Sequence, residues 1–174
     1  MVADSPAALA FFDMSSFYKK TINDWLDAQW ANGAYTETSI WQDLNDPKGI
    51  GHGAGETVWA SAPLVLTVRH YQNYGDYDLL QRSFHHHIKW LEFLENYFDQ
   101  GMEKKGFTKE LDTKVKMGGA GLGDWLALRE RDTFLTHTGF YMASGRCVAY
   151  IAHMLDRKEE EKQGMSVAKK IRDR

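Results

Sequence analysis

The sequence lacks the features of a disulfide-linked, nucleic-acid-binding or membrane-spanning protein. Its single cysteine, Cys147, lies in an apolar run and can form neither a disulfide framework nor a multi-cysteine metal site. We expect it to pack as a small apolar side chain. A formal net charge of −3 provides no basic surface for nucleic acid or anionic membranes. With no apolar run of membrane-spanning length and no signal-peptide pattern, we expect a soluble protein whose compartment the sequence leaves open.

Several catalytic motifs are absent as well. The glycine runs GIGHGAG and GGAGLG match neither the P-loop nor, without a preceding strand, the dinucleotide fingerprint, and no G-x-S-x-G nucleophile elbow occurs. The run His85-His86-His87 suggests a metal site, but adjacent helical positions point about 100° apart and cannot converge on one ion. We expect neither a cofactor nor a metal.

What the sequence does contain is apolar and aromatic. Of its 174 residues, 43% are hydrophobic and 13% are aromatic, with six tryptophans and eight tyrosines. This is enough for one domain, residues 1–174, with a substantial core. Aromatic side chains serve both protein cores and sugar-stacking surfaces, and composition alone does not separate the two.

The stretch 50–74 dominates the pattern, because a glycine-rich approach runs into a segment with almost no polar face. A helix that is apolar nearly all round must be surrounded by protein. We expect such buried helices at about 56–74 and 132–155. More amphipathic helices are expected from Ser5 to near Gly33, with an undecided break near residues 14–16, at 77–99, and from about Lys158.

The order of these helices predicts an all-α fold. Compactly joined consecutive helices tend to be antiparallel neighbours, which puts the two long connections, 31–55 and 101–130, at one end of the bundle. Long connections in compact domains are usually functional. An α/α toroid of alternating inner and outer helices, with its site at that end, fits best.

Four residues are candidates for a ligand site at this end. Trp59 and Trp125 can offer apolar faces to a sugar ring, although core packing is slightly favoured for either alone. Asp124 can accept hydrogen bonds from ligand hydroxyls or, equally well, cap a short helix. Glu56 is placed at the first turn of a helix, where its charge suits the helix dipole and a structural role suffices.

Four segments of the chain share a recognisable pattern: FDMSSFYKKTINDWLDAQWANGAY, ETVWASAPLVLTVRHYQNYGDYDLLQRSFHHHIKWLEFL, GLGDWLAL and DTFLTHTGFYMASGRCVAYIAHMLDR. Their most telling parts are DWLDAQ-x-x-x-G after an aromatic helix, W-x-x-A followed by Y-x-x-YGD, and GDWLA. Together, in this order, the segments resemble the catalytic toroid of bacterial α-L-rhamnosidases, which are six-hairpin glycosidases.

The resemblance implies hydrolysis of terminal α-L-rhamnosides by inversion, with Trp59 and Trp125 as walls of the sugar site and Asp124 as a polar contact. The acidic motif D-E-R-x-G-W-x-G-D, which supplies the family's general acid, does not occur here, and the catalytic base is expected beyond Arg174. The family's W-G-D reads Trp59-Ala60-Ser61. The chain therefore resembles about half of a toroid.

Three functional interpretations remain open at this point. The chain is a rhamnosidase segment that is inactive by itself, a non-catalytic helical relative that binds carbohydrate or a partner, or another six-hairpin glycosidase using acids such as Glu56 and Asp124. A half toroid also leaves open seams, so we expect self-association through exposed apolar surface.

Overall fold

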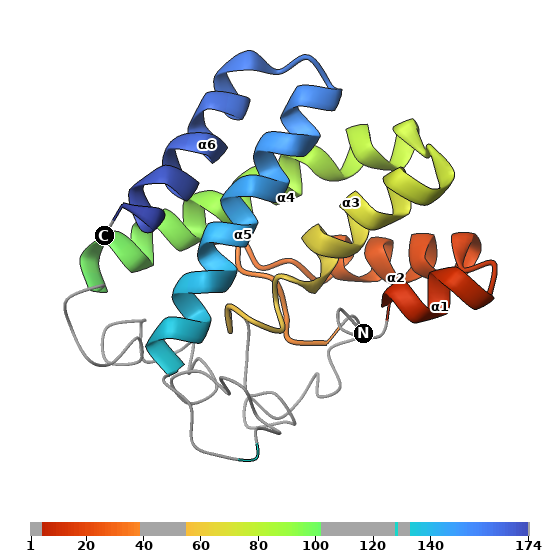
Figure 1. Cartoon of the computed structure of the whole chain (residues 1–174), viewed down its shortest axis with the longest axis horizontal. Helices are drawn as coiled ribbons and strands as arrows, with labels where there is room; N and C mark the ends of the chain where they lie inside the picture. The colour runs from red at the N-terminus through yellow and green to blue at the C-terminus, as the bar shows by residue number, and fades with distance from the viewer. Residues whose placement is uncertain (1–4, 39–54, 102–127, 129–132, 174) are drawn as a thin grey trace.

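The computed structural model describes residues 5–38, 55–101, 128 and 133–173, and in them the chain is helical (Figure 1). No strand forms among these residues, so the predicted all-α class is confirmed. The helices are α1 (Ser5–Phe11), α2 (Ser15–Asp27), α3 (Ala62–Tyr74), α4 (Tyr77–Gly101), α5 (Thr133–Met154) and α6 (Lys158–Arg172).

One boundary that the sequence left undecided is now defined, and another differs from the expectation. The first helical segment breaks near residues 14–16 into α1 and α2, and the Ser15 N–H at the start of α2 donates to the Asp13 carboxylate at 3.0 Å. The expected helix at 56–74 begins only at Ala62, because Pro63 lies in its first turn. Proline has no N–H to donate to the preceding turn, so a helix does not continue through it from residue 56.

The predicted stop and restart at Gly75-Asp76 is confirmed. Gly75 ends α3 in the left-handed conformation, with φ +65°, and its N–H donates to the Tyr71 carbonyl at 2.8 Å. Asp76 then begins the next turn, with its Oδ1 accepting from the Leu79 N–H at 3.0 Å. The α3–α4 corner is thereby fixed by local contacts.

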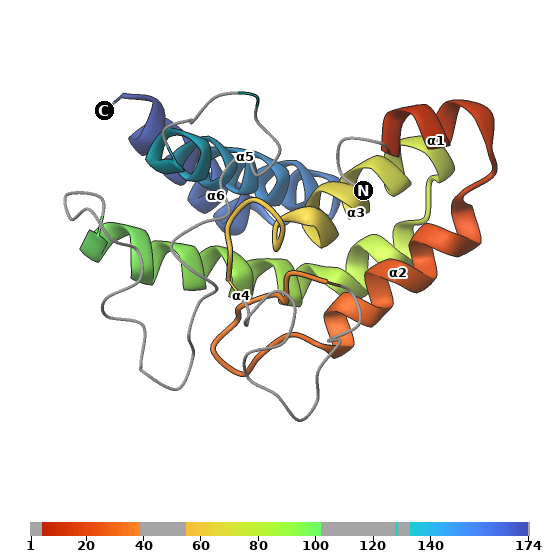
Figure 2. The same cartoon turned by 90° about the horizontal axis from the view of Figure 1, so that it is seen from below.

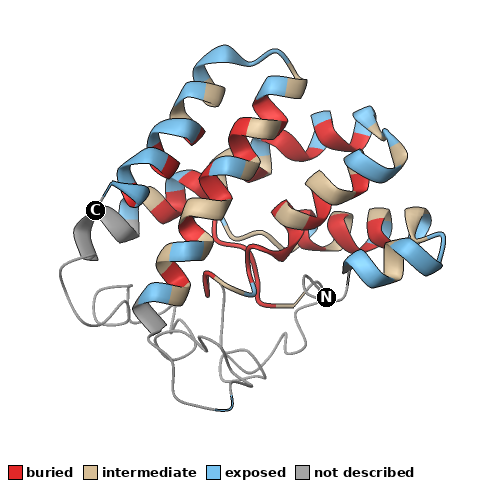
Figure 3. Cartoon of the chain, viewed as in Figure 1, coloured by how far each residue is buried: buried red, intermediate tan, exposed pale blue. Residues whose placement is uncertain are grey.

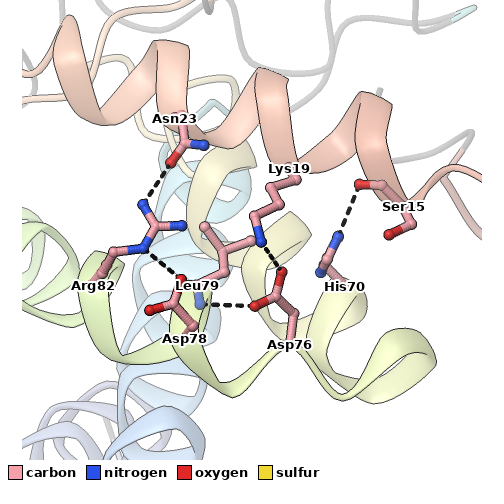
Figure 4. Close-up of polar contacts among 8 residues, drawn as sticks. All are labelled: Ser15, Lys19, Asn23, His70, Asp76, Asp78, Leu79 and Arg82. Atoms are coloured by element: carbon pink, nitrogen blue, oxygen red, sulfur yellow. Dashed lines mark hydrogen bonds and ion pairs between the residues drawn. The ribbon is translucent and has the colours of Figure 1, made fainter.

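The same aspartate also connects the corner to α2. Lys19 Nζ lies 2.7 Å from Asp76 Oδ2, so each carboxylate oxygen has its own donor (Figure 4). Burial by itself raises the pKa of Asp76, but the hydrogen bonds from Lys19 and Leu79 outweigh it and hold that pKa below its ordinary value. Asp76 therefore remains ionised where α2, α3 and α4 meet.

Two further contacts bind α2 to the helices below it in Figure 4. His70 Nε2 on α3 lies 3.0 Å from the Ser15 carbonyl oxygen, which can only accept, so Nε2 carries the hydrogen. Arg82 on α4 donates to Asp78 at 2.9 Å and to Asn23 on α2 at 3.3 Å. These polar contacts join α2 to both α3 and α4, with His70 buried and Arg82 exposed.

The core lies where α3, α4 and α5 meet, and buried positions gather there in Figure 3. Figure 2 shows α2 and α4 along one side of the molecule, with α3 and α5 across the other. Trp90 is fully buried at the centre, stacked on Phe93 with ring centroids 5.5 Å apart, and its indole N–H donates to Ser144 Oγ at 3.3 Å. The most deeply buried large side chains include Tyr35, Ile22, Leu64, Leu66, Leu79, Leu80, Leu91, Leu94 and Ile151.

The two helices expected to be enclosed differ in how far they are covered. Along α3 only Gln72 and Asn73, near its end, are exposed. Helix α5 is exposed along one stripe, at Leu135, Gly139, Arg146 and His153. Its apolar sequence is thus only partly covered within this chain. Cys147 is a free, half-buried thiol, and burial raises its pKa to about 11.

Helices α5 and α6 form the most extensive helix pair, and glycine makes their close approach possible. A Cβ atom added to Gly145 would lie 2.8 Å from the Gly164 carbonyl oxygen, and one added to Gly164 would lie 2.5 Å from that of Gly145. The hairpin therefore depends on having no side chain at either position. No helix among the described residues is long and apolar enough to cross a membrane.

Candidate functional site

The candidate site is built on residues 55–61, the segment that leads into α3. Gly55 has φ +93°, a conformation that favours glycine, and its N–H donates to the Tyr35 carbonyl at 2.8 Å. The chain then turns, with the Ala60 N–H donating to the Glu56 carbonyl at 2.8 Å. The segment is thus fixed to the core before it reaches α3.

Tyr35 is itself held by a chain of buried hydrogen bonds. Its hydroxyl lies 2.8 Å from His87 Nδ1, and His87 Nε2 lies 3.1 Å from Thr67 Oγ1, which donates to the Pro63 carbonyl at 2.8 Å. Because the threonine hydrogen is used on that carbonyl, Thr67 accepts from His87 Nε2–H, and Nδ1 accepts from Tyr35. Burial, followed by the neighbouring His86, lowers the pKa of His87 to about 3, so the ring is neutral.

Glu56 is the central polar residue of the segment. Its side chain is only 1% exposed, and each of its two carboxylate oxygens lies close to a nitrogen atom, although only Oε2 accepts a hydrogen bond with regular geometry. Oε2 accepts from the Trp59 N–H at 2.7 Å, and Oε1 lies 3.1 Å from Nε2 of His137 on α5. The prediction that Glu56 lies in the first helical turn and interacts with the helix dipole is wrong, because the proline delays the start of α3 and leaves Glu56 in the preceding turn.

Trp59 lies on this turn and is 38% exposed. By contrast, the tryptophan on α2 and the tryptophan on α4 are enclosed, since Trp25 is 3% exposed and Trp90 is 0% exposed. Trp59 thus keeps a large apolar surface open to solvent, as a sugar-stacking side chain requires. Complete enclosure in the core, the competing interpretation of its role, does not describe it here.

A second carboxyl group, Glu37, lies near Glu56 and is buried, at 5% exposure. Burial is the main cause and the Glu56 carboxylate the second cause of a pKa raised to about 8. Glu37 therefore keeps its proton at neutral pH. The site then holds one neutral carboxyl group beside the carboxylate that contacts His137.

Further buried polar atoms belong to Glu37 and to the residues next to Glu56 and His137. The atoms Glu37 Oε1, Glu56 Oε1, Thr57 Oγ1 and Thr138 Oγ1 are buried and accept or donate no hydrogen bond among the described residues, so the 3.1 Å contact between Glu56 and His137 is a close approach at ion-pair distance and not an aligned hydrogen bond. Thr57 and Thr138 directly follow Glu56 and His137 in the sequence. Buried polar groups usually have partners, so this is a place where the protein can offer hydrogen bonds.

The structure brings together only part of the predicted site. Glu56 and Trp59 are joined by a direct hydrogen bond. Asp124 and Trp125 lie outside the described residues. Glu37 and His137 were not anticipated from the sequence. A histidine inside a largely apolar helix was the available signal for His137, since a buried polar group requires a partner.

The three consecutive histidines diverge, as their helical spacing predicts. His85 is exposed, His86 Nδ1 lies 2.7 Å from Gln29 Oε1, and His87 faces the core. Burial is the main cause of a lowered pKa at His86, and the neighbouring His85 and Lys89 add to it. Within the described ranges, no group of three potential metal ligands forms.

The contact between Glu56 and His137 also bears on the topology. It joins the end of the first long connection to the beginning of α5, where the second connection ends. Both lie towards the bottom of the view in Figure 1. The described ends of the two connections therefore meet, while most of each connection, and with it the expectation that both share one end of the bundle, lies outside the described residues.

Comparisons with known proteins all lead to one family. The family model described as the bacterial alpha-L-rhamnosidase 6 hairpin glycosidase domain matches residues 2–174. A curated α-L-rhamnosidase of Streptomyces avermitilis is 26% identical over 156 residues, which make up 87% of this chain and 12% of that protein.

Two solved structures have similar folds. The α-L-rhamnosidase from Dictyoglumus thermophilum matches with a TM-score of 0.74 and 25% identity, over 99% of this chain and 18% of that one. The Streptomyces avermitilis α-L-rhamnosidase complexed with L-rhamnose matches with a TM-score of 0.67 and 23% identity, over 92% of this chain and 14% of that one. The chain thus spans less than a fifth of the length of each relative.

Proposed function

This chain belongs to the bacterial α-L-rhamnosidase six-hairpin glycosidase family, a family of glycoside hydrolases, and on that premise we propose that it forms a sugar-binding part of an inverting enzyme for terminal α-L-rhamnosides. The observation that carries this proposal is the exposed Trp59 indole, on a turn fixed by Glu56, in a chain that the family model matches from residue 2 to 174.

Three of the four members of the proposed sugar site contact the sugar. Trp59 and Trp125 are the apolar walls that stack on the sugar ring, and Asp124 accepts hydrogen bonds from its hydroxyls. Glu56 belongs to the same site, but its buried carboxylate acts on the protein side, through the Trp59 N–H. The ligand is a rhamnose-containing glycoside or polysaccharide.

We propose further that this chain does not hydrolyse rhamnosides by itself. Inversion requires one carboxylic acid to protonate the leaving group and a second carboxylate to activate water. The family's acidic motif is not among these 174 residues, and the second carboxylate is expected in a later hairpin. General acid–base assistance contributes about 10² to 10⁴ in rate per group, so turnover without both groups stays near background.

An assay of the purified chain with an aryl α-L-rhamnoside tests this proposal. Wild type, Glu56→Gln and Asp124→Asn are compared, and all three are expected to release aryl alcohol no faster than buffer. Robust hydrolysis by the wild type that either substitution abolishes would instead favour an in-chain catalytic pair, as in another six-hairpin glycosidase.

A non-catalytic helical relative is the other alternative. Such a protein would bind carbohydrate or a protein partner without ever contributing to hydrolysis. The distinction lies in the coding sequence on either side of residues 1–174. The motif D-E-R-x-G-W-x-G-D directly upstream identifies a segment of an enzyme, and its absence favours the non-catalytic relative.

A further inference from the structure

Glu56 uses its two carboxylate oxygens on two different elements. Oε2 accepts from the Trp59 N–H at 2.7 Å within its own turn, and Oε1 lies 3.1 Å from His137 Nε2 on α5. Both side chains are buried, with 1% and 5% of the side-chain surface exposed. The carboxylate is therefore a bridge between the turn that carries Trp59 and the first part of α5.

The length of the glutamate side chain matters to this bridge. Asparagine, aspartate and serine are the usual residues that accept a backbone N–H at the start of a helical turn, because their short side chains fold back easily. Glutamate is not needed for that contact alone. Its additional methylene group lets one oxygen remain on the Trp59 N–H while the other reaches α5.

The position of the Trp59 ring depends on this turn. Glu56, Thr57 and Ala60 are buried, whereas Trp59 is 38% exposed. The backbone at Trp59 is held from the inner side by Glu56, and the indole extends to the outer side. A shift of the turn relative to α5 therefore moves the indole.

We infer that Glu56 and His137 are positioning residues that fix the Trp59 indole for ligand binding by joining its turn to α5. They do so without contacting the ligand. The neutral state of Glu37 is consistent with this arrangement, since it leaves the Glu56 carboxylate without a second negative charge beside it. The inference rests on the proposed function only where it assigns the sugar to Trp59.

The test has one measurement that needs no sugar. Each variant is also made with Trp59→Phe. Subtracting the fluorescence spectrum of this counterpart from the spectrum of the variant leaves the emission of Trp59. Its wavelength and its quenching by acrylamide are compared in wild type, His137→Ala, Glu56→Asp and Glu56→Gln. Gly139→Ala is the matched control on α5, because an added Cβ there contacts nothing within 4 Å.

Glu56→Asp separates the two possible roles. If Glu56 only caps its own turn, aspartate serves as well or better, and the Trp59 signal stays as in wild type. The bridge predicts that Glu56→Asp changes the Trp59 fluorescence in the same direction as His137→Ala, because the shorter side chain no longer reaches His137 on α5. Glu56→Gln, which keeps the length, is expected to remain closer to wild type than Glu56→Asp.

A parallel titration with L-rhamnose supplies the functional measurement. His137→Ala and Glu56→Asp are expected to raise the Kd by roughly threefold to tenfold, which corresponds to about 0.6 to 1.4 kcal/mol of binding free energy. A wild type that does not bind rhamnose refutes the proposed function, while the Trp59 signal still judges the positioning role. Trp59 signals of His137→Ala and Glu56→Asp that coincide with wild type and Gly139→Ala overturn the inference.

Discussion

Glu37 illustrates how one buried side chain makes stability depend on pH. Its pKa is raised from 4.5 to about 8, so between these values the folded state holds a proton that the unfolded state has released. The stabilisation is complete below about 4.5 and is lost as the pH rises towards 8.

We therefore predict that the wild type becomes less stable between pH 5 and pH 8, by on the order of a few kcal/mol, and that Glu37→Gln removes most of this difference. Urea unfolding at the two pH values measures it. Glutamine is a suitable replacement, since it resembles the protonated carboxyl group. A wild type and a variant with parallel pH dependence would show that Glu37 ionises normally.

His87 provides a second prediction at the scale of a single residue. Burial lowers its pKa to about 3, and its hydrogen bonds assign the hydrogen to Nε2. We expect NMR of ¹⁵N-labelled histidine to show the neutral Nε2–H form of His87 at pH 5. An imidazolium signal from His87 at pH 5 contradicts this assignment.

Removing one partner from the hydrogen bonds that link Tyr35, His87 and Thr67 is expected to lower the stability of the fold. Tyr35→Phe leaves His87 Nδ1 buried without its donor, and we predict a loss of about 1 to 3 kcal/mol in the free energy of unfolding. Tyr150→Phe is a control on α5, where the tyrosine is only half-buried. Urea unfolding compares the two, and an equal effect would mean that the hydrogen bond to His87 contributes nothing particular.

At the scale of helices, the α5–α6 pair depends on the contact between Gly145 and Gly164. We predict that Gly145→Ala destabilises the chain by about 1 to 3 kcal/mol, because the added methyl group meets the backbone of α6. On the same helix, Gly139→Ala meets nothing within 4 Å and is expected to stabilise by about 0.5 to 1 kcal/mol through helix propensity.

Chemical denaturation of these two variants separates the effect of packing from that of helix propensity. Both variants replace a helical glycine by alanine, so the difference between their free energies of unfolding reports the contact of the added methyl group with α6. If Gly145→Ala is as stable as Gly139→Ala, the two helices can separate without cost and the close contact is unimportant.

Much of the helix pattern could be predicted from the sequence because it depends on local signals. The stop and restart at Gly75-Asp76 follows from the two residues themselves. The start of α3 was placed too early, although Pro63 was visible, because the apolar run in front of it resembles a buried helix. Glu37 and His137 were missed because their roles arise from contacts between segments far apart in the chain.

At the scale of the whole molecule, exposed apolar side chains mark surfaces that lack a neighbour. Phe11, Phe12 and Phe17 are 80%, 68% and 56% exposed near the end of α1 and the start of α2, and Leu135 on α5 is 71% exposed. Exposed apolar side chains of this kind favour association where they gather into a patch.

We predict that the isolated chain self-associates as its concentration rises. Phe11→Ser combined with Phe12→Ser is expected to reduce this association, and Tyr77→Ser serves as a control at another exposed aromatic position, on α4. Sedimentation velocity measures the effect. A monomer at every concentration that also binds no apolar dye would argue against open seams in a half toroid.

The central claim is that this chain contains a rhamnose-binding surface built on Trp59. Calorimetric titration of the chain with L-rhamnose tests it most directly, with Trp59→Ala and Trp125→Ala as variants and Trp30→Ala as the control tryptophan, in the turn after α2. Saturable binding in the millimolar range, roughly −4 kcal/mol, is predicted for wild type and control and its loss in the other two. No binding by the wild type, or binding that both Trp59→Ala and Trp125→Ala leave unchanged, contradicts the account.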